Sequence, residues 1–541
     1  MVGVAVWQSI GYDTEWSPVW WLDLNTKQSS KWSLLLLPRF LFFLIAVNLI
    51  PTSPMLEQHH FQTINFGGVG ASPGKSRKRV FPVPDTQDLN PVAEAYGYCN
   101  TPNRTEQAWE GHSPADYRLL SVQVMIRHGD RYPLYSIPKT KRPTIDCTLS
   151  ASRKPSHTLL KSFIRHMGQG GRGHWESPLA SLPRLPNHSA CEMGELTQTG
   201  VVQHLHNGQL LHRAYKLHGL LPSDWSPHHI WVETTGKSRT LQSGLAFLYG
   251  FLPDFNWEKL TVRHQWSTLF CGSACDCPAR NQYLEEEQRR QYQLRVANTE
   301  LERTYADMAR TLGLSTRQLR AANPIDSLLC HLCHGLPFPC ASVGDGGVGG
   351  CLSLAQFAVI RHQQLEDEVE RRKLGTYHKY AILAMYPYLN RTVAKMEQAA
   401  RVMEAGRLQR SGTEEIFSLS SAHDVTIAPL LSALGLKGAK FPRFAARVVF
   451  ELWRSPTQTE GQPKKRAGKN KKSKAKDGEL FIRVLYNGED VTFHTAFCRS
   501  HNRRVSQPLC PLKNFVSFVK RDMFSVVNAT SYREACYKRL N

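Results

Sequence analysis

A run of apolar and β-branched residues at Leu120–Ile126 ends directly at a polar motif, and this junction constrains the fold more than any other feature. The run, LSVQVMI, predicts a buried strand. The motif at Arg127–Pro133, RHGDRYP, follows the pattern Arg-His-Gly-x-Arg-x-Pro. Its five fixed positions occur by chance roughly once in ten thousand chains of this length. Because α/β enzymes place their sites just past the C-terminal end of a strand, the junction predicts a functional site there.

Two further runs end at polar residues in the same way. The run IWVE at Ile230–Glu233 leads through a turn into a helix that contains Arg239. A run at Ile416–Ser420 ends close to His423 and Asp424, and the following VTIAPLLSALGL reads as a helix. Strands that alternate with helices predict a layered α/β fold.

The residue types at these junctions suit the hydrolysis of a phosphate monoester, which is extremely slow without catalysis. The imidazole of His128 can attack phosphorus and form a phosphohistidine, so that one hard step becomes two easier ones. Arginines match phosphate oxygens bidentately and keep their charge. The departing alkoxide needs a proton, and the carboxylic acid of Asp424 can supply it and then activate water. Because Asp424 must start protonated, we expect the best activity below neutral pH.

Taken together, the Arg127–Pro133 motif, the Ser-Arg-Thr around Arg239 and the later His423-Asp424 resemble the histidine acid phosphatase branch of the histidine phosphatase superfamily. The resemblance implies a layered α/β core with a smaller, mostly helical, disulfide-rich cap, and no metal or other cofactor. It implies that His128 is the nucleophile and Asp424 the proton donor. The phosphate ligands that it implies are Arg127, Arg131, Arg239 and His423.

Longer stretches narrow the resemblance within this family. They extend from about residue 96 to the C-terminus and include HGDRYPLY, CEMGELTQTGVVQHL, ETTGKSRTLQSG, RAANPIDS and FPRFAAR. They are similar to the xylosyl phosphatases of glycosaminoglycan synthesis. The resemblance implies a Golgi membrane enzyme that removes the 2-phosphate from xylose in the linkage region of proteoglycans. The phosphorylated linkage-region glycan is then the expected partner, and linkage-region glycosyltransferases are further expected partners.

Cysteines and sequons favour an oxidising, lumenal environment for most of the chain. None of the 13 cysteines precedes Cys99, which fits a reducing N-terminal side and an oxidising remainder. The odd number leaves at least one thiol unpaired or intermolecular. The glycosylation candidates are the sequon residues Asn103, Asn187, Asn390 and Asn528.

An apolar segment at 33–50 follows Lys27 and Lys31 and shows no obvious small-residue cleavage site. It predicts a signal-anchor with a cytosolic N-terminus and a type II topology. Pro38 and Arg39 interrupt the segment, and a cleaved signal peptide is the alternative. The expected order is a cytosolic tail at 1–32, the anchor at 33–50, a stem at 51–112, and a lumenal phosphatase domain at 113–541, with cap insertions at about 141–190 and 275–365 and a basic loop at 455–476.

Other interpretations stay open at this point. The stretch CHLCH at 330–334 fits a c-type haem site, and the cysteines at 271–277 could add a zinc site. In an oxidising lumen, disulfides are the favoured interpretation of both. A broad acid phosphatase or a phytase-like inositol polyphosphate phosphatase is the alternative enzyme. A non-catalytic binder of acidic glycans through the basic run 464–476 is the alternative of another class, and we expect no nucleic-acid partner, because a lumenal chain would not meet one.

Overall fold

The structure is a computed structural model, and it describes the residues 90–102, 108–112, 116–171, 173–216, 229–252, 257–341, 350–373, 375–404, 415–456, 478–499 and 509–538. All of these ranges belong to one compact unit, which holds Phe81–Asn541 together with Met1–Ser17. The second unit, Pro18–Val80, lies outside the described residues, as do the expected anchor, Asn103 and most of the basic loop. Within the described part, no helix is both long enough and apolar enough to cross a bilayer.

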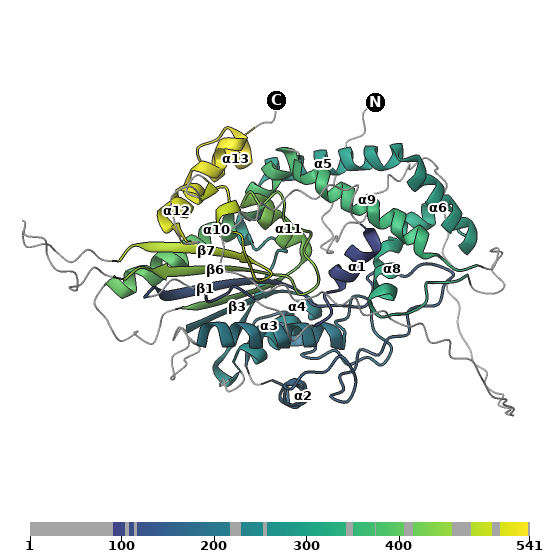
Figure 1. Cartoon of the computed structure of the whole chain (residues 1–541), viewed down its shortest axis with the longest axis horizontal. Coiled ribbons are helices and arrows are strands. Elements are labelled where there is room, and N and C mark those ends of the chain that lie inside the picture. Colours follow the sequence, from purple (N-terminus) through teal and green to yellow (C-terminus); the bar gives the residue numbers. More distant parts are fainter. Residues whose placement is uncertain are drawn as a thin grey trace, which may run out of the picture. The chain divides into compact units, whose positions relative to one another are not determined.

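One mixed sheet of nine described strands forms the centre of the protein (Figure 1). Its order is β2-β4-β3-β5-β1-β6-β7-β8, and β9 also pairs with β7. The first five strands in this order run parallel, whereas the pairs beyond β1 are antiparallel. The strands are β1 Arg118–Arg127, β2 His174–Trp175, β3 Ile230–Thr235, β4 Thr261–Gln265, β5 Phe417–Ala422, β6 Arg447–Arg454, β7 Leu480–Tyr486, β8 Glu489–Asp490 and β9 Cys510–Pro511.

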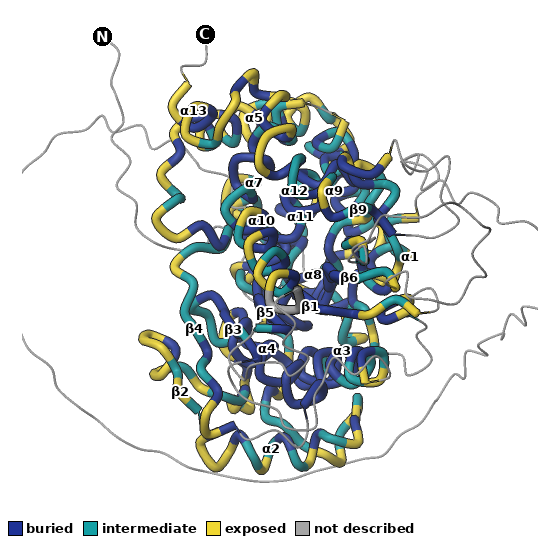
Figure 2. Tube along the Cα trace, turned by 90° about the vertical axis from the view of Figure 1, so that its left-hand side faces the viewer, coloured by how far each residue is buried: buried dark blue, intermediate teal, exposed yellow. Residues whose placement is uncertain are grey.

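Helices cover both faces of this sheet, and the α/β layering expected from the sequence is therefore confirmed (Figures 1 and 2). On one face, Val122, Val124 and Ile126 of β1 pack with α3 and α4. On the other face, Leu120 and Met125 pack with α10 and α11. Burial on both faces is why β1 reads as a nearly continuous apolar run. The helices here are α3 Gln198–Lys216, α4 Ser238–Phe251, α10 Gly375–Glu404, α11 Asp424–Ala433, α12 Leu512–Lys520 and α13 Tyr532–Tyr537.

Helices α3 and α4 approach each other so closely that their backbones touch. A Cβ added at Gly208 of α3 would lie 2.0 Å from the carbonyl oxygen of Phe247, and one added at Gly250 of α4 would lie 2.3 Å from that of Leu205. Two glycines, one on each helix, therefore set the spacing of the layer beneath the site.

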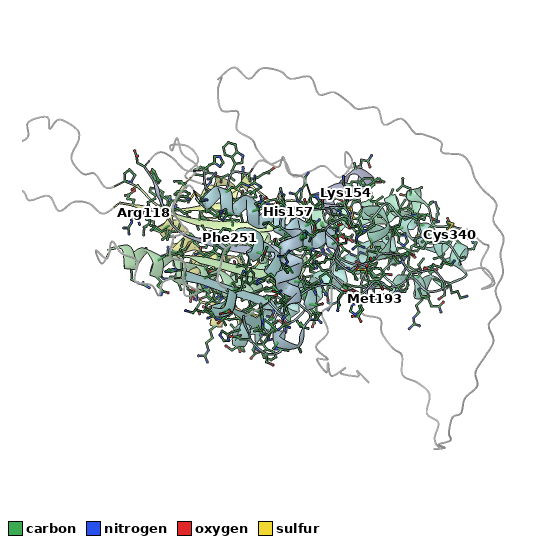
Figure 3. All side chains as sticks on the ribbon, turned by 90° about the horizontal axis from the view of Figure 1, so that it is seen from below. Arg118, Lys154, His157, Met193, Phe251 and Cys340 are labelled. Atoms are coloured by element: carbon green, nitrogen blue, oxygen red, sulfur yellow. A yellow bond between two sulfur atoms is a disulfide. The ribbon has the colours of Figure 1, made fainter. Side chains whose placement is uncertain are left out.

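A separate apolar cluster forms the mostly helical cap that the sequence predicts. It brings together Ile325 and Leu328 of α8 with Phe357 of α9. Figure 3 shows Arg118, at the start of β1, and Cys340, between α8 and α9, on opposite sides of the view, so β1 runs toward the cap. The helices of this cluster are α1 Pro91–Cys99, α6 Thr299–Leu312, α7 Thr316–Ala321, α8 Pro324–Cys333 and α9 Leu354–Lys373. Helix α5, Pro278–Ala297, packs Ala279 and Tyr283 in the cluster that α10 and α11 form on the sheet.

The segment 141–190 contains the short helix α2, Leu160–Gly168, and strand β2. Its apolar side chains, Phe163 and Leu179 among them, join the cluster that α3 and α4 form under the sheet. This segment therefore packs with the core layer, whereas the helices α6 to α9 supply most of the cap cluster.

Twelve of the 13 cysteines form six disulfides, and Cys330 is buried and unpaired. The expected disulfides and the expected odd thiol are therefore confirmed. All three cysteines at 271–277 and Cys333 of the CHLCH stretch are oxidised, so these sulfurs are not offered to zinc or haem as thiols. The pairs are Cys99–Cys333, Cys147–Cys191, Cys271–Cys275, Cys277–Cys536, Cys340–Cys351 and Cys498–Cys510.

Candidate active site

The motif that follows β1 lies beside the His-Asp pair that follows β5, because these two strands are parallel neighbours. Arg127 lies opposite Ala422 in the register, and the backbone N–H of His128 donates to the carbonyl of Ala422 at 2.9 Å. The ring centroids of His128 and His423 are 5.6 Å apart. Two dipeptides separated by almost 300 residues in the sequence thus form one buried polar cluster.

Arg127 is fully buried and held from several sides. Its Nη2 lies 2.8 Å from Oδ2 of Asp424 and donates to the hydroxyl of Tyr98 at 2.8 Å. Its Nη1 donates to the carbonyl of Pro442 at 2.8 Å, and the guanidinium lies over the rings of Tyr98 and Phe444. This arrangement fixes the cation and orients the Asp424 carboxylate toward the cluster.

His128 is fully buried, and its Nδ1 lies 2.8 Å from the carbonyl of Gly129. A carbonyl only accepts, so Nδ1 carries the proton in the neutral ring and Nε2 carries the lone pair. Gly129 is required here, because an added Cβ would lie 2.5 Å from the Cα of Gly200 on α3. The N–H of Gly129 donates to Ser243 of α4, which ties the motif to the layer below.

Arg239 and His423 reach the same edge of the sheet from β3 and β5. His423 is buried, and its Nε2 lies 2.8 Å from Oγ1 of Thr235, the last residue of β3. Arg239 is buried in the first turn of α4. Its Nη1 would lie 3.3 Å from a Cβ at Gly194, so the loop before α3 closes over it. The C-terminal ends of three adjacent parallel strands therefore supply the predicted phosphate ligands.

Arg131 is turned toward the cap. Its guanidinium binds both carboxylate oxygens of Asp326 on α8, at 3.0 and 3.4 Å. The preceding residue, Asp130, is buried, and its Oδ2 lies 2.8 Å from Nε2 of His334 at the end of the same helix. The structure thus adds Tyr98, Asp326 and His334 to the surroundings of the site. No sequence pattern pointed to a role for them there, and His334 was noticed only within the haem-like stretch.

The electrostatic surroundings of the cluster follow from its burial and its ion pairs. Burial raises the pKa of Tyr98, and the charge of Arg127 partly opposes this rise, so the hydroxyl stays neutral and can accept from Arg127. Burial, with a smaller contribution from nearby Arg447, lowers the pKa of His204, on α3 beneath β1, to about 3. The only described cluster with metal-ligand geometry is Cys147, Cys191 and Glu195, but its two sulfurs form a disulfide.

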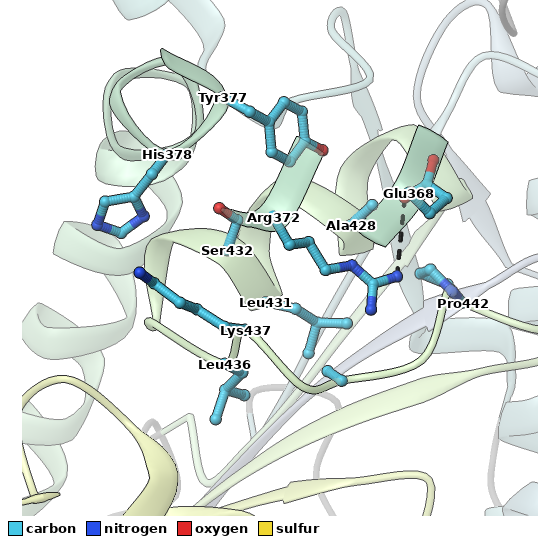
Figure 4. A pocket seen from close by; sticks show the side chains of 11 residues that line it. Glu368, Arg372, Tyr377, His378, Ala428, Leu431, Ser432, Leu436, Lys437 and Pro442 are labelled. Atoms are coloured by element: carbon cyan, nitrogen blue, oxygen red, sulfur yellow. Dashed lines mark ion pairs between the residues drawn. The ribbon is translucent and has the colours of Figure 1, made fainter. Parts of the chain in front are cut away.

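A small pocket lies one helical turn along α11 from Asp424 (Figure 4). Its lining includes Ala428 of α11 and Pro442, whose carbonyl accepts from Arg127. Arg372 points into it and pairs with Glu368 at 3.7 Å. None of the predicted site residues lines this pocket, so it is separate from the Arg127 cluster, although Pro442 adjoins both.

The fold and the site define the class of this protein. The chain belongs to the histidine phosphatase superfamily (branch 2), whose family model matches residues 118–487. It is 62% identical to 2-phosphoxylose phosphatase 1 of Danio rerio over 504 aligned residues, and the alignment covers 92% of this chain and 95% of that protein. It is 53% identical over 506 residues to 2-phosphoxylose phosphatase 1 of Homo sapiens, covering 92% and 98%. Among solved structures, the apo form of Hafnia alvei phytase aligns with 16% identity over 75% of this chain and 97% of that one, with a TM-score of 0.41.

Proposed function

We propose that this protein is a phosphomonoesterase that removes the 2-phosphate from xylose in the glycosaminoglycan–protein linkage region of proteoglycans. The observation that carries the proposal is the complete Arg127, His128, His423 and Asp424 cluster in a chain 62% identical to a 2-phosphoxylose phosphatase. The family match across residues 118–487 supports the reaction class, and the similarity to the named relatives supports the sugar.

In the proposed reaction, Nε2 of His128 attacks phosphorus and forms a phosphorus–nitrogen bond as the bond from phosphorus to the xylose oxygen breaks. Asp424 gives its proton to the departing xylose oxygen. Water then attacks the phosphohistidine, Asp424 takes a proton from that water, and inorganic phosphate leaves. The Nδ1 contact with the carbonyl of Gly129 supports this role, because it directs the lone pair of the ring to Nε2.

The phosphate ligands of the proposal are Arg127, Arg131, Arg239 and His423. Charge spreads over the oxygens of the transferred group, and preorganised cations stabilise it most where water is excluded. Arg127 and Arg239 are buried, as is Arg131. Their burial supports a site in which the cations are already in place before the substrate arrives.

We also propose that the enzyme is a type II Golgi membrane protein with its catalytic domain in the lumen. Six disulfides support an oxidising compartment for the described domain. The sequon residues Asn187, Asn390 and Asn528 are exposed, as glycan attachment requires. The segment 33–50 would be the anchor, and linkage-region glycosyltransferases would be partners in the same membrane.

The test is phosphate release by the purified protein from three substrates: a 2-phosphoxylose linkage oligosaccharide, phytate and a small aryl phosphate. The His128→Ala variant is the control. The proposal predicts the highest kcat/KM on the phosphoxylose substrate and no release by the variant. A higher kcat/KM on phytate would mean that the substrate is an inositol polyphosphate and not phosphoxylose. Phosphate release by His128→Ala would reject His128 as the nucleophile.

A further inference from the structure

We propose that Asp326 and His334, both contributed by helix α8 of the cap, are positioning residues for the phosphate site, and that the His334 contact makes this positioning depend on pH. The inference rests on the proposed phosphatase function. It assigns a role to the contacts between the cap and the motif. Two consecutive motif residues, Arg131 and Asp130, are hydrogen-bonded to residues at the two ends of helix α8.

Asp326 lies in the first turn of α8 and acts on the far end of the motif. Its Oδ1 accepts from Nη2 of Arg131 at 3.0 Å, and its Oδ2 accepts from the backbone N–H of Leu134 at 2.6 Å. Arg131 also donates to the carbonyl of Tyr132 at 3.1 Å. The Asp326 carboxylate binds the planar guanidinium of Arg131 on one side and thereby fixes the direction in which the other side faces the phosphate.

His334 caps the other end of α8 and acts on Asp130. Oδ2 of Asp130 accepts from Nε2 of His334 at 2.8 Å and from Oγ1 of Thr197 at 2.5 Å. Asp130 is 1% exposed, and its Oδ1 has no hydrogen-bond partner among the described residues. A protonated His334 is therefore the cation that compensates a buried carboxylate, and its loss leaves that charge uncompensated beside the nucleophile.

A disulfide between α8 and α1 restrains the position of α8 relative to the motif. Cys333, next to His334, is bonded to Cys99 at the end of α1. The neighbouring Tyr98 accepts from Arg127. The cap thus reaches three of the motif residues, Arg127, Asp130 and Arg131, through one pair of linked helices.

The pH dependence follows from the surroundings of His334. Burial lowers the pKa of His334, but the adjacent Asp130 raises it by more, so the net pKa is raised. His331 lies on the same helix, and the charged pair Arg131 and Asp326 lies on the same side of the motif. From α1 and α9, which pack against α8, Glu94 and Arg361 face each other as an ion pair at 2.5 Å. A raised pKa means that the contact is charged at acidic pH and that its positive charge is lost as the pH rises through the folded-state value.

The experiment compares His334→Ala, His334→Gln and Asp326→Asn, with Glu302→Gln as the matched control. Glu302 pairs with Arg320 at 2.5 Å within the cap and away from the motif. Each variant is assayed for kcat and KM on an aryl phosphate across pH, and for affinity toward inorganic phosphate by calorimetry. Phosphate affinity needs no turnover, so it tests the positioning even if the proposed substrate is wrong.

The expected result is a loss of about 100-fold in kcat/KM for His334→Ala, the size that a small misplacement of a site costs. His334→Gln keeps a hydrogen-bond donor that does not titrate, so it retains most of the wild-type activity. Its activity also falls less as the pH rises, because the contribution of His334 to that fall is absent. Asp326→Asn weakens phosphate binding about 10-fold, and Glu302→Gln matches the wild type. Wild-type pH profiles and phosphate affinities in the His334 and Asp326 variants would overturn the proposal. A His334→Ala loss that only follows the fraction of folded protein, with no rescue by glutamine, would also overturn it.

Discussion

The fully buried His204 lies on α3 beneath β1, and its ionisation should lower the stability of the protein in acid. Burial lowers its pKa from 6.5 to about 3. Because the folded-state pKa lies below the unfolded value, the stabilisation is complete above about pH 6.5 and is lost as the pH falls toward the folded value. Applying linkage to these two values gives a loss of about 2 kcal/mol between about pH 7.5 and pH 5 from this side chain alone.

The assay is urea unfolding of wild type and His204→Gln at both pH values. Glutamine does not titrate, so the free energy of unfolding of the variant should depend on pH less steeply, by about 2 kcal/mol over this interval. Comparing the two pH differences cancels the cost of the substitution itself and the contribution of every other group. An equal pH dependence in the two proteins would refute the conclusion that His204 is buried in its neutral form.

Three further predictions concern packing, a buried ion pair and the proton donor. Gly250→Ala would place a Cβ 2.3 Å from the carbonyl oxygen of Leu205, so we expect a destabilisation of about 2 kcal/mol by denaturant unfolding. Arg447 pairs with Glu110 at 2.7 Å, and both side chains are fully buried. Arg447→Met leaves the Glu110 carboxylate without this partner, so it should lower the free energy of unfolding by about 3–5 kcal/mol. An unchanged midpoint of denaturant unfolding would contradict this expectation. Asp424→Asn should reduce kcat on an alkyl phosphate about 10²–10⁴-fold and reduce it much less on an aryl phosphate, whose leaving group needs no proton; equal losses would argue against the donor role.

The sequence predicted the parts of the site that depend on local signals. The run before Arg127 is apolar because β1 is buried on both faces. Polar residues directly after the predicted strands indicated which edge of the sheet holds the site. The same logic located His423 and Asp424 after β5. Arg239 alone suggested a surface arginine, and only the family resemblance assigned it to the site, where it is buried in the first turn of α4. The structure brings these residues to one sheet edge, and their catalytic roles remain predictions.

The sequence could not predict which cap residues meet the motif. The contact between Asp130 and His334 spans 204 residues, and the Cys99–Cys333 disulfide spans 234. Such pairings depend on how the chain crosses from sheet to cap, and local periodicity carries no information about this path. For the same reason, His334 was noticed only in a haem-like pattern, although its partner is a carboxylate of the motif.

If His128 is the nucleophile, it becomes phosphorylated during turnover, and the phosphoenzyme can be trapped. The protein would be mixed with a substrate, denatured within milliseconds at alkaline pH, which preserves phosphohistidine, and digested for mass spectrometry. We expect a phosphoryl group on His128 in the wild type and none on any residue of His128→Ala, which should also release no phosphate. Phosphate release without a phosphoenzyme, or a phosphoryl group on another residue, would contradict this role of His128.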